Sequence, residues 1–181
     1  MKITTGRVPR GESSVFVRVP GWATGASLSV NGKPQPAEPG KYAEVRRVWA
    51  EGDVVELTLP MKPRLVEAHP LVEEARNQVA VCRGPLVYCL ESPDLPQGVS
   101  LQSVSLPRRG EWTPRFDKDL LGGVTVLDGK AEVGGGAAWG RQLYRELKPD
   151  APKTIDVRLV PYFAWGNRGR SEMTVWIPLG R

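Results

Sequence analysis

The sequence predicts an all-β protein made of two small antiparallel β-sandwich domains in tandem, with jelly-roll-like strand arrangements. Glycine and proline contribute 20 and 17 of the 181 residues, and so many turn formers favour short elements over helical bundles or coiled coils. Apolar and polar residues alternate along much of the chain, which is the pattern of half-buried strands. Since 40% of the residues are hydrophobic, the chain can bury a core.

The first half of the chain is predicted to contain short strands at spacings of about 8–12 residues, which is typical of sandwiches. Valines at every second position from 15 to 19 share one face of the first of these strands. Asn31-Gly32 predicts a hairpin with a type I′ turn, because this turn needs positive φ at both central residues. The predicted strands cover residues 13–19, 26–30, 42–49, 54–59, 63–68, 79–82 and 86–90, and residues 71–75 form a predicted helical turn.

A proline-rich segment at residues 92–98 is predicted to link the two domains. It carries two prolines and one glycine in seven residues, a composition that is typical of linkers. Domain I is therefore expected to cover residues 1–92, and domain II residues 93–181.

Turn signals also organise the second half of the chain. Asp128-Gly129 predicts a hairpin turn between strands at residues 123–127 and 130–133. The glycine-rich run 134–138 is predicted to be a loop, because its spacing matches neither a P-loop nor a Rossmann turn. Further strands are predicted at residues 99–106, 154–160 and 173–177.

Charge and hydropathy argue against several classes of protein. The net charge is +5, but the basic residues are dispersed among apolar and acidic ones, which favours a solvated surface over nucleic-acid binding. No apolar run approaches the roughly 20 residues that a membrane helix needs. The N-terminus lacks the apolar stretch of a signal peptide, and no disulfide set is evident, so a cytoplasmic location is expected.

Few residues offer nucleophilic, metal-binding or acid–base chemistry. Cys82 and Cys89 form no C-x-x-C pair and have no partner histidine, so both are predicted to be buried apolar residues. His69, the only histidine, is held extended by the proline that follows it and is interpreted as a structural or surface residue. Four glutamates that are candidates for a catalytic pair are interpreted as ordinary surface acids: Glu67, Glu73, Glu74 and Glu91.

The chain contains six tryptophans and four tyrosines, which leave two interpretations open. Aromatic side chains of small β domains mostly pack in a core or an interface, and Trp49 and Trp176 fit that role because they lie within predicted strands. Trp22 follows a Pro-Gly break, and residues 162–165 hold three aromatics within four positions. If they are exposed, these side chains are suited to stacking on sugar rings.

Several motifs, taken in order, resemble one known family. They include Pro-Gly-Trp-Ala at residues 20–23, Val-Asn-Gly at 30–32, Arg-Gly-Pro-Leu-Val-Tyr at 83–88 and Pro-Tyr-Phe-Ala-Trp-Gly-Asn-Arg at 161–168. The sequence resembles the C-terminal region of glycoside hydrolase family 127, the β-L-arabinofuranosidase family. The similarity extends over nearly the whole chain and is strongest in residues 15–91 and 154–177.

The resemblance implies an architecture in which an N-terminal (α/α)6 barrel precedes two β-sandwich domains. It implies retaining hydrolysis of terminal β-L-arabinofuranosides by a zinc-bound cysteine nucleophile and a glutamate acid/base, all located in the barrel. Cys82 and Cys89 match none of these motifs, so no catalytic or metal-binding residue is assigned to this chain. Zinc is accordingly expected in the barrel alone.

The resemblance therefore implies a non-catalytic C-terminal module that packs on and orients a catalytic barrel absent from this chain. A stand-alone carbohydrate-binding module with exposed Trp and Tyr side chains is the alternative, whereas an autonomous enzyme conflicts with the missing nucleophile–base pair. Arabinose-containing glycans and a second copy of the chain are further candidate partners. The candidate residues for contact with a sugar or with the barrel are Trp22, His69, Tyr162, Trp165, Asn167 and Arg168.

Overall fold

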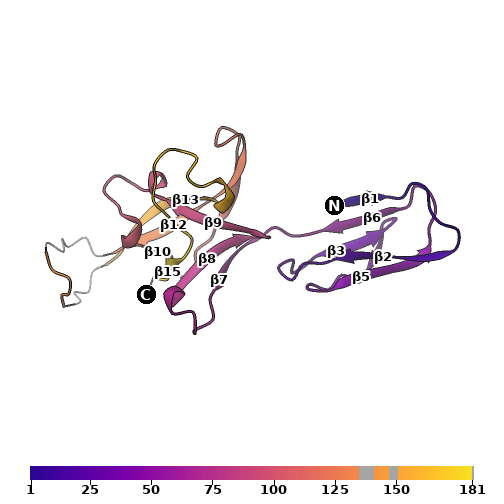
Figure 1. Cartoon of the computed structure of the whole chain (residues 1–181), viewed down its shortest axis with the longest axis horizontal. Coiled ribbons are helices and arrows are strands. Elements are labelled where there is room, and N and C mark those ends of the chain that lie inside the picture. Colours follow the sequence, from indigo (N-terminus) through magenta and orange to yellow (C-terminus); the bar gives the residue numbers. More distant parts are fainter. Residues whose placement is uncertain (135–140, 147–150, 181) are drawn as a thin grey trace. The chain divides into compact units, whose positions relative to one another are not determined.

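The computed structural model describes residues 1–134, 141–146 and 151–180, and the chain forms two compact units (Figure 1). Unit 1 comprises Met1–Lys62, and unit 2 comprises Pro63–Arg181. The named strands pair antiparallel, and the helical elements among the described residues are 3-10 turns of three residues each. The predicted all-β fold is therefore confirmed.

Unit 1 is built from two sheets that share one core. A four-stranded sheet has the order β1-β6-β3-β4, and strands β2 and β5 form a separate pair. Valines of β2 and β5 are buried together with aliphatic residues of β3 and β6, and Trp49 belongs to the same core, as predicted. The strands are β1 (Lys2–Thr4), β2 (Glu12–Arg18), β3 (Ser27–Val30), β4 (Lys33–Gln35), β5 (Tyr42–Val48) and β6 (Val54–Thr58).

The hairpin between β3 and β4 turns at Asn31 and Gly32, whose φ values of 48° and 75° are both positive, as predicted. The Asn31 side chain also ties this turn to β6. Its Oδ1 accepts a hydrogen bond from Val54 N–H (2.8 Å), and its Nδ2 donates to Asp53 Oδ1 (2.7 Å). Hydrogen bonds from Ala50 N–H and from Asn31 hold the pKa of Asp53 below its ordinary value, so this carboxylate is charged at neutral pH.

Unit 2 contains one hydrogen-bonded path of strands, β10-β12-β13-β9-β8-β15, with β11 on β12, β14 on β9 and β7 on β8. Residues 153–159 of β13 pair with β12 and residues 160–161 pair with β9, so β13 belongs to both halves of the path. Leu106 N–H donates to Pro178 O (2.8 Å), and Gly180 N–H donates to Leu106 O (2.7 Å). These bonds connect the chain just after β10 to β15, so the path closes on itself.

The closed path surrounds the main core of unit 2. Tyr88, Leu90, Leu127 and Leu159 are among its fully buried side chains, and they come from both halves of the path. The elements of unit 2 are β7 (Pro63–Glu67), η1 (Glu73–Ala75), β8 (Gln78–Arg83), β9 (Leu86–Glu91), η2 (Ser92–Asp94), η3 (Leu101–Ser103), β10 (Val104–Ser105), β11 (Thr113–Asp117), β12 (Val124–Val133), β13 (Lys153–Pro161), η4 (Tyr162–Ala164), β14 (Met173–Thr174) and β15 (Ile177–Pro178).

The units divide between Lys62 and Pro63, whereas the proline-rich composition predicts a border at residues 92–93. The difference arises because β8 and β9 lie in the middle of the unit 2 path, where β9 pairs with β13 and contributes to the unit 2 core. The predicted linker, residues 92–98, begins with η2 and lies within unit 2. Proline and glycine mark chain reversals as well as linkers, so composition alone does not separate the two.

Other predicted elements also differ from the structure. Asp128 and Gly129 lie inside the continuous strand β12, so the predicted hairpin turn is wrong. Glycine is required there because the Trp112 indole packs on its backbone, and a Cβ at residue 129 would lie 2.5 Å from Trp112 Cε3. The predicted strand 99–106 is mainly η3 followed by the short β10, and 173–177 divides into β14 and β15.

Two remaining predictions concern local segments. The predicted helical turn at residues 71–75 is observed as η1. Residues 135–138 of the predicted glycine-rich loop lie outside the described residues. Within the ranges that the structure describes, no helix has the length and hydropathy that a membrane crossing requires.

We expect a fragment of residues 63–181 to unfold in one cooperative thermal transition, because its core is complete without unit 1. A fragment of residues 93–181 keeps the β12–β13 pair but lacks β8 and β9, so β14 and β15 lose their partner strands and β13 loses one of its two neighbours. This fragment should show no cooperative transition. Circular dichroism during heating measures both. Cooperative unfolding of the shorter fragment would place the border at residue 92 after all.

Gly129→Ala is expected to destabilise the chain by about 1–3 kcal/mol, because the added methyl group overlaps the Trp112 ring inside a packed region. Gly134→Ala is the matched control, since it follows the same strand and an added Cβ there meets nothing within 4 Å. Urea unfolding of the two variants compares them directly. Equal stability of both variants would contradict the packing role of Gly129.

Candidate functional site

Unit 2 carries an open groove of about 980 Å³, lined by aromatic, aliphatic and uncharged polar side chains and one carboxylate. Tyr162 and Trp165 line it with ring centroids 6.5 Å apart and planes tilted by 32°, and the two residues are 47% and 41% exposed. Trp176 is half-buried and lines the same groove. This surface is called the aromatic groove, and its lining includes Gln78, Gln102, Tyr162, Trp165, Glu172 and Trp176.

The loop that follows β13 positions the two exposed rings. Trp165 N–H donates to Tyr162 O (3.3 Å), and Gly166 adopts a positive φ of 75° directly after the second ring. Asn167 Nδ2 donates to Ala164 O (3.1 Å) and to Trp165 O (3.2 Å). Asn167 therefore acts on the groove through the backbone that carries the rings.

An ion cluster anchors the same loop. Arg168 Nη1 and Nη2 donate to the two carboxylate oxygens of Asp94 (2.9 and 2.5 Å), and Arg168 Nε and Nη2 donate to Glu91 Oε2. Glu91 Oε1 accepts hydrogen bonds from Gly166 N–H (2.9 Å) and Ser171 Oγ (3.1 Å). Glu91 is fully buried at the end of β9. One guanidinium thus joins β9 and η2 to the loop that carries the aromatic rings.

Hydrogen bonding and charge keep this cluster ionised. Burial by itself raises the pKa of Glu91, but hydrogen bonds from Gly166 and Arg168, together with the Arg168 charge, hold that pKa below its ordinary value. Hydrogen bonds to Asp94 and Glu91 raise the pKa of Arg168, although burial opposes them. A carboxylate without exposed surface is tolerated here because each of its oxygens has a hydrogen-bond donor.

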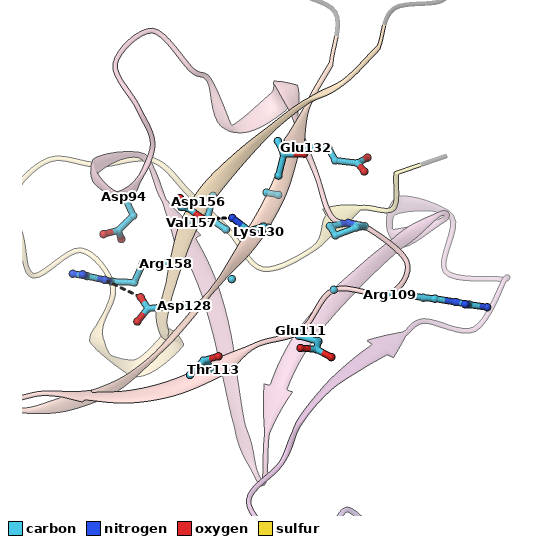
Figure 2. A pocket seen from close by; sticks show the side chains of 15 residues that line it. Asp94, Arg109, Glu111, Thr113, Asp128, Lys130, Glu132, Asp156, Val157 and Arg158 are labelled. Atoms are coloured by element: carbon cyan, nitrogen blue, oxygen red, sulfur yellow. Dashed lines mark hydrogen bonds and ion pairs between the residues drawn. The ribbon is translucent and has the colours of Figure 1, made fainter.

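A second hollow of about 880 Å³ is lined mainly by residues of β12 and β13, several of which are charged (Figure 2). Lys130 Nζ donates to Asp156 Oδ1 (2.8 Å). Asp128 accepts a hydrogen bond from Arg115 (2.6 Å) and pairs with Arg158 (3.5 Å). Because Lys130, Asp156, Asp128 and Arg158 are already engaged in these contacts, the aromatic groove is the better candidate site.

Comparison with known families accounts for both units. Residues 63–178 match the glycoside hydrolase family 127 C-terminal domain, and residues 1–61 match the β-L-arabinofuranosidase GH127 middle domain. The chain belongs to glycoside hydrolase family 127. The two matches meet at the border between unit 1 and unit 2, so the division of this family into domains coincides with the structural one.

Individual GH127 proteins are similar over most of the chain. A non-reducing end β-L-arabinofuranosidase of Bifidobacterium longum is 38% identical over 88% of this chain. A solved glycoside hydrolase structure has a TM-score of 0.91 at 47% identity, and a GH127 β-L-arabinofuranosidase from Geobacillus stearothermophilus has a TM-score of 0.88 at 39% identity, each over 99% of this chain. The chain spans 25% of the Bifidobacterium protein and 30% and 28% of the two solved chains.

The structure of this GH127 chain brings four of the six sequence-predicted site residues into one loop: Tyr162, Trp165, Asn167 and Arg168. Trp22 is half-buried in unit 1 and belongs to no part of this loop. His69 is exposed, and its Nδ1 accepts a hydrogen bond from Leu71 N–H (3.2 Å) in the turn before η1. Its observed contact is therefore within that turn.

Two residues of the site differ from the sequence analysis. The sequence predicts Glu91 to be a surface acid, but it is fully buried because Arg168, 77 positions later, supplies its counter-charge. The sequence predicts Trp176 to lie in the core, but this residue lies in the short segment between β14 and β15, where it lines the groove. A usable signal for Glu91 was its position at the end of a continuous apolar run, since such a run indicates a strand buried on both faces.

The two thiols are buried and free, as predicted. Burial raises the pKa of Cys89 to about 12, and burial also raises the pKa of Cys82, so both are protonated at neutral pH. Among the residues that the structure describes, no group of three or more His, Cys, Asp or Glu is arranged to hold a metal ion. These residues therefore do not fit the zinc site that the family resemblance implies for the barrel.

Arg168→Met is expected to lower the free energy of unfolding at pH 7 by about 3–5 kcal/mol, because it leaves Glu91 buried without its counter-charge. In the wild-type chain the pKa of Glu91 is lower in the folded state than its ordinary value of 4.5. The ionised Glu91 therefore stabilises the folded state fully above pH 4.5, and this stabilisation is lost as the pH falls through the folded-state pKa. Urea unfolding between pH 7 and pH 3 measures both effects.

Arg170→Met is the matched control for this experiment, since Arg170 is an exposed arginine of the same loop. The double variant Glu91→Gln/Arg168→Met should recover part of the lost stability, because it removes the buried charge. If Arg168→Met and Arg170→Met are equally stable at pH 7, the ion cluster does not anchor the loop.

Proposed function

We propose that this chain is the non-catalytic β-sandwich region of an enzyme similar to β-L-arabinofuranosidases, and that it packs on and orients a catalytic (α/α)6 barrel. One observation carries the proposal. Models of a middle domain and of a C-terminal domain together account for residues 1–61 and 63–178, while the relatives are between three and four times longer than the matched region.

The chemistry of the described residues supports a role outside catalysis. A cysteine nucleophile reacts as the thiolate, but burial keeps Cys82 and Cys89 protonated. The buried carboxylate Glu91 is committed to Arg168, Gly166 and Ser171. These groups stabilise the fold and are not free to attack a substrate or to transfer a proton.

Unit 1 offers a surface on which a barrel would pack. The outer face of the β2–β5 pair exposes Phe16, Tyr42 and Val48 by 61%, 62% and 64%. Phe16 pairs with Glu44, which places the Phe16 ring diagonally next to Tyr42 on one face of the pair. Phe16 and Tyr42 form an exposed apolar pair on a face that also carries the Glu12–Arg46 ion pair, and an apolar spot rimmed by polar residues is typical of an interface. The relatives are much longer than this chain, and their remaining residues are expected to form a barrel domain that covers this face in the same polypeptide.

Replacing the matching region of the Bifidobacterium relative by this chain should give a folded enzyme that hydrolyses 4-nitrophenyl β-L-arabinofuranoside. Deleting that region should lower both the thermal midpoint and the activity, because the barrel then loses its supporting surface. This chain alone should not hydrolyse the substrate. Hydrolysis by the isolated chain, or an unimpaired enzyme after deletion, would contradict the proposal.

A Phe16→Ser/Tyr42→Ser double variant locates the contact in the same experiment. In the isolated chain both side chains are exposed, and the Tyr42 ring loses only its contact with the Arg18 guanidinium, 5.5 Å from the ring centroid, so the thermal midpoint should change little. In the chimeric enzyme the midpoint should fall, because the two side chains are buried against the barrel. A fall of equal size in both proteins would place the effect within unit 1 and exclude this face as the interface.

A further inference from the structure

The aromatic groove has the chemistry of a carbohydrate site. Tyr162 and Trp165 expose tilted ring faces 6.5 Å apart, and Trp176 adds a third aromatic side chain to the lining. The face of an aromatic ring is electron-rich and attracts the polarised C–H bonds on one face of a sugar ring. Two adjacent rings therefore suit a ligand with two consecutive sugar units.

Some polar side chains of the groove are bound within the protein, since Ser171 Oγ donates to Glu91 Oε1 and Thr174 Oγ1 donates to Trp176 O, but others are not. In the described part of the chain, the side-chain amides of Gln78 and Gln102 and the indole N–H groups of Trp165 and Trp176 have no hydrogen-bond partner. Amides both donate and accept, as sugar hydroxyls do. The groove thus offers hydrogen bonds beside its stacking faces, as specific ligand sites do.

Charge selects the kind of saccharide. Among the residues that the structure describes, the groove is lined by one carboxylate, Glu172, and by no lysine or arginine. A carboxylate accepts hydrogen bonds from neutral hydroxyl groups but repels uronates, sulfates and phosphates. The lining therefore favours a neutral oligosaccharide over an anionic one.

The groove is also held in shape before any ligand arrives. The Arg168–Glu91 contact and the Asn167 side chain fix the loop that carries Tyr162 and Trp165. Ordering the rings in advance lowers the entropy cost of binding. Conversely, burying the groove under a protein partner would leave the amides of Gln78 and Gln102 in need of new partners.

From these observations we propose that the aromatic groove of unit 2 is a binding site for neutral oligosaccharides, stacked on Tyr162 and Trp165. The site lies wholly within unit 2, and its described lining holds a single carboxylate, not the pair that hydrolysis of a glycosidic bond uses. It adds a binding activity to the supporting role described above and does not depend on that role. Its ligand is bound, not cleaved.

The test uses the whole 181-residue chain and saturation-transfer NMR with arabinotriose, xylotriose and a trigalacturonate. We expect saturable binding of at least one neutral trisaccharide, with a Kd on the order of 1 mM, and none of the trigalacturonate. Trp165→Ala and Tyr162→Ala should each weaken binding about tenfold, because each removes one stacking face. Phe163→Ala is the matched control, since this neighbour is 67% exposed but does not line the groove.

The outcomes separate the alternatives. Absence of binding to every neutral trisaccharide, by wild-type chain with its normal thermal midpoint, overturns the proposal. Equal weakening by Phe163→Ala and Trp165→Ala also overturns it, because the effect then does not come from the groove. If Trp165→Ala instead lowers the thermal midpoint of the chimeric enzyme and no sugar binds, the groove is a contact with the barrel. Hydrolysis by the chimera is measured independently, so failure of one proposal leaves the other intact.

Discussion

The arrangement of unit 2 around its groove depends on one guanidinium. Arg168 joins Glu91, at the end of a central strand, and Asp94, in the following 3-10 turn, to a loop that lies more than seventy positions later in the chain. The loop itself contains no strand or long helix that would order it. The geometry of the loop therefore depends on a charge-assisted contact between distant segments, and this contact fixes the position of the aromatic rings.

Closure of the strand path makes this possible. Because the segment after β10 bonds to β15, the strands of unit 2 enclose a core that is continuous from Tyr88 to Leu159. A closed path leaves few edges and holds the last residues of β13 beside Tyr88 and Cys89 of β9. The ion cluster begins at the end of β9 and the aromatic loop follows the end of β13, so two neighbouring strands of the sheet position the groove.

Local patterns predicted most strands and the Asn31-Gly32 turn, because alternation and turn chemistry act over a few residues. Local patterns give a wrong prediction where contacts with a distant segment determine the conformation or the burial of a residue. The predicted border at residues 92–93 cut through one unit, since the partner of β9 is β13, about seventy positions away. The burial of Glu91 and the strand conformation at Gly129 likewise depend on Arg168 and Trp112, which no local window contains. The aromatic loop was found from composition, but the amides beside it were not.

The placement of the cysteines has a practical consequence. Both cysteines of the chain lie in unit 2, both are buried, and their pKa values are raised by burial. Alkylating reagents reach them only when β8 or β9 opens, while unit 1 contributes no signal. The rate of thiol labelling thus measures how often unit 2 opens within the two-unit chain, and this measurement needs no engineered probe.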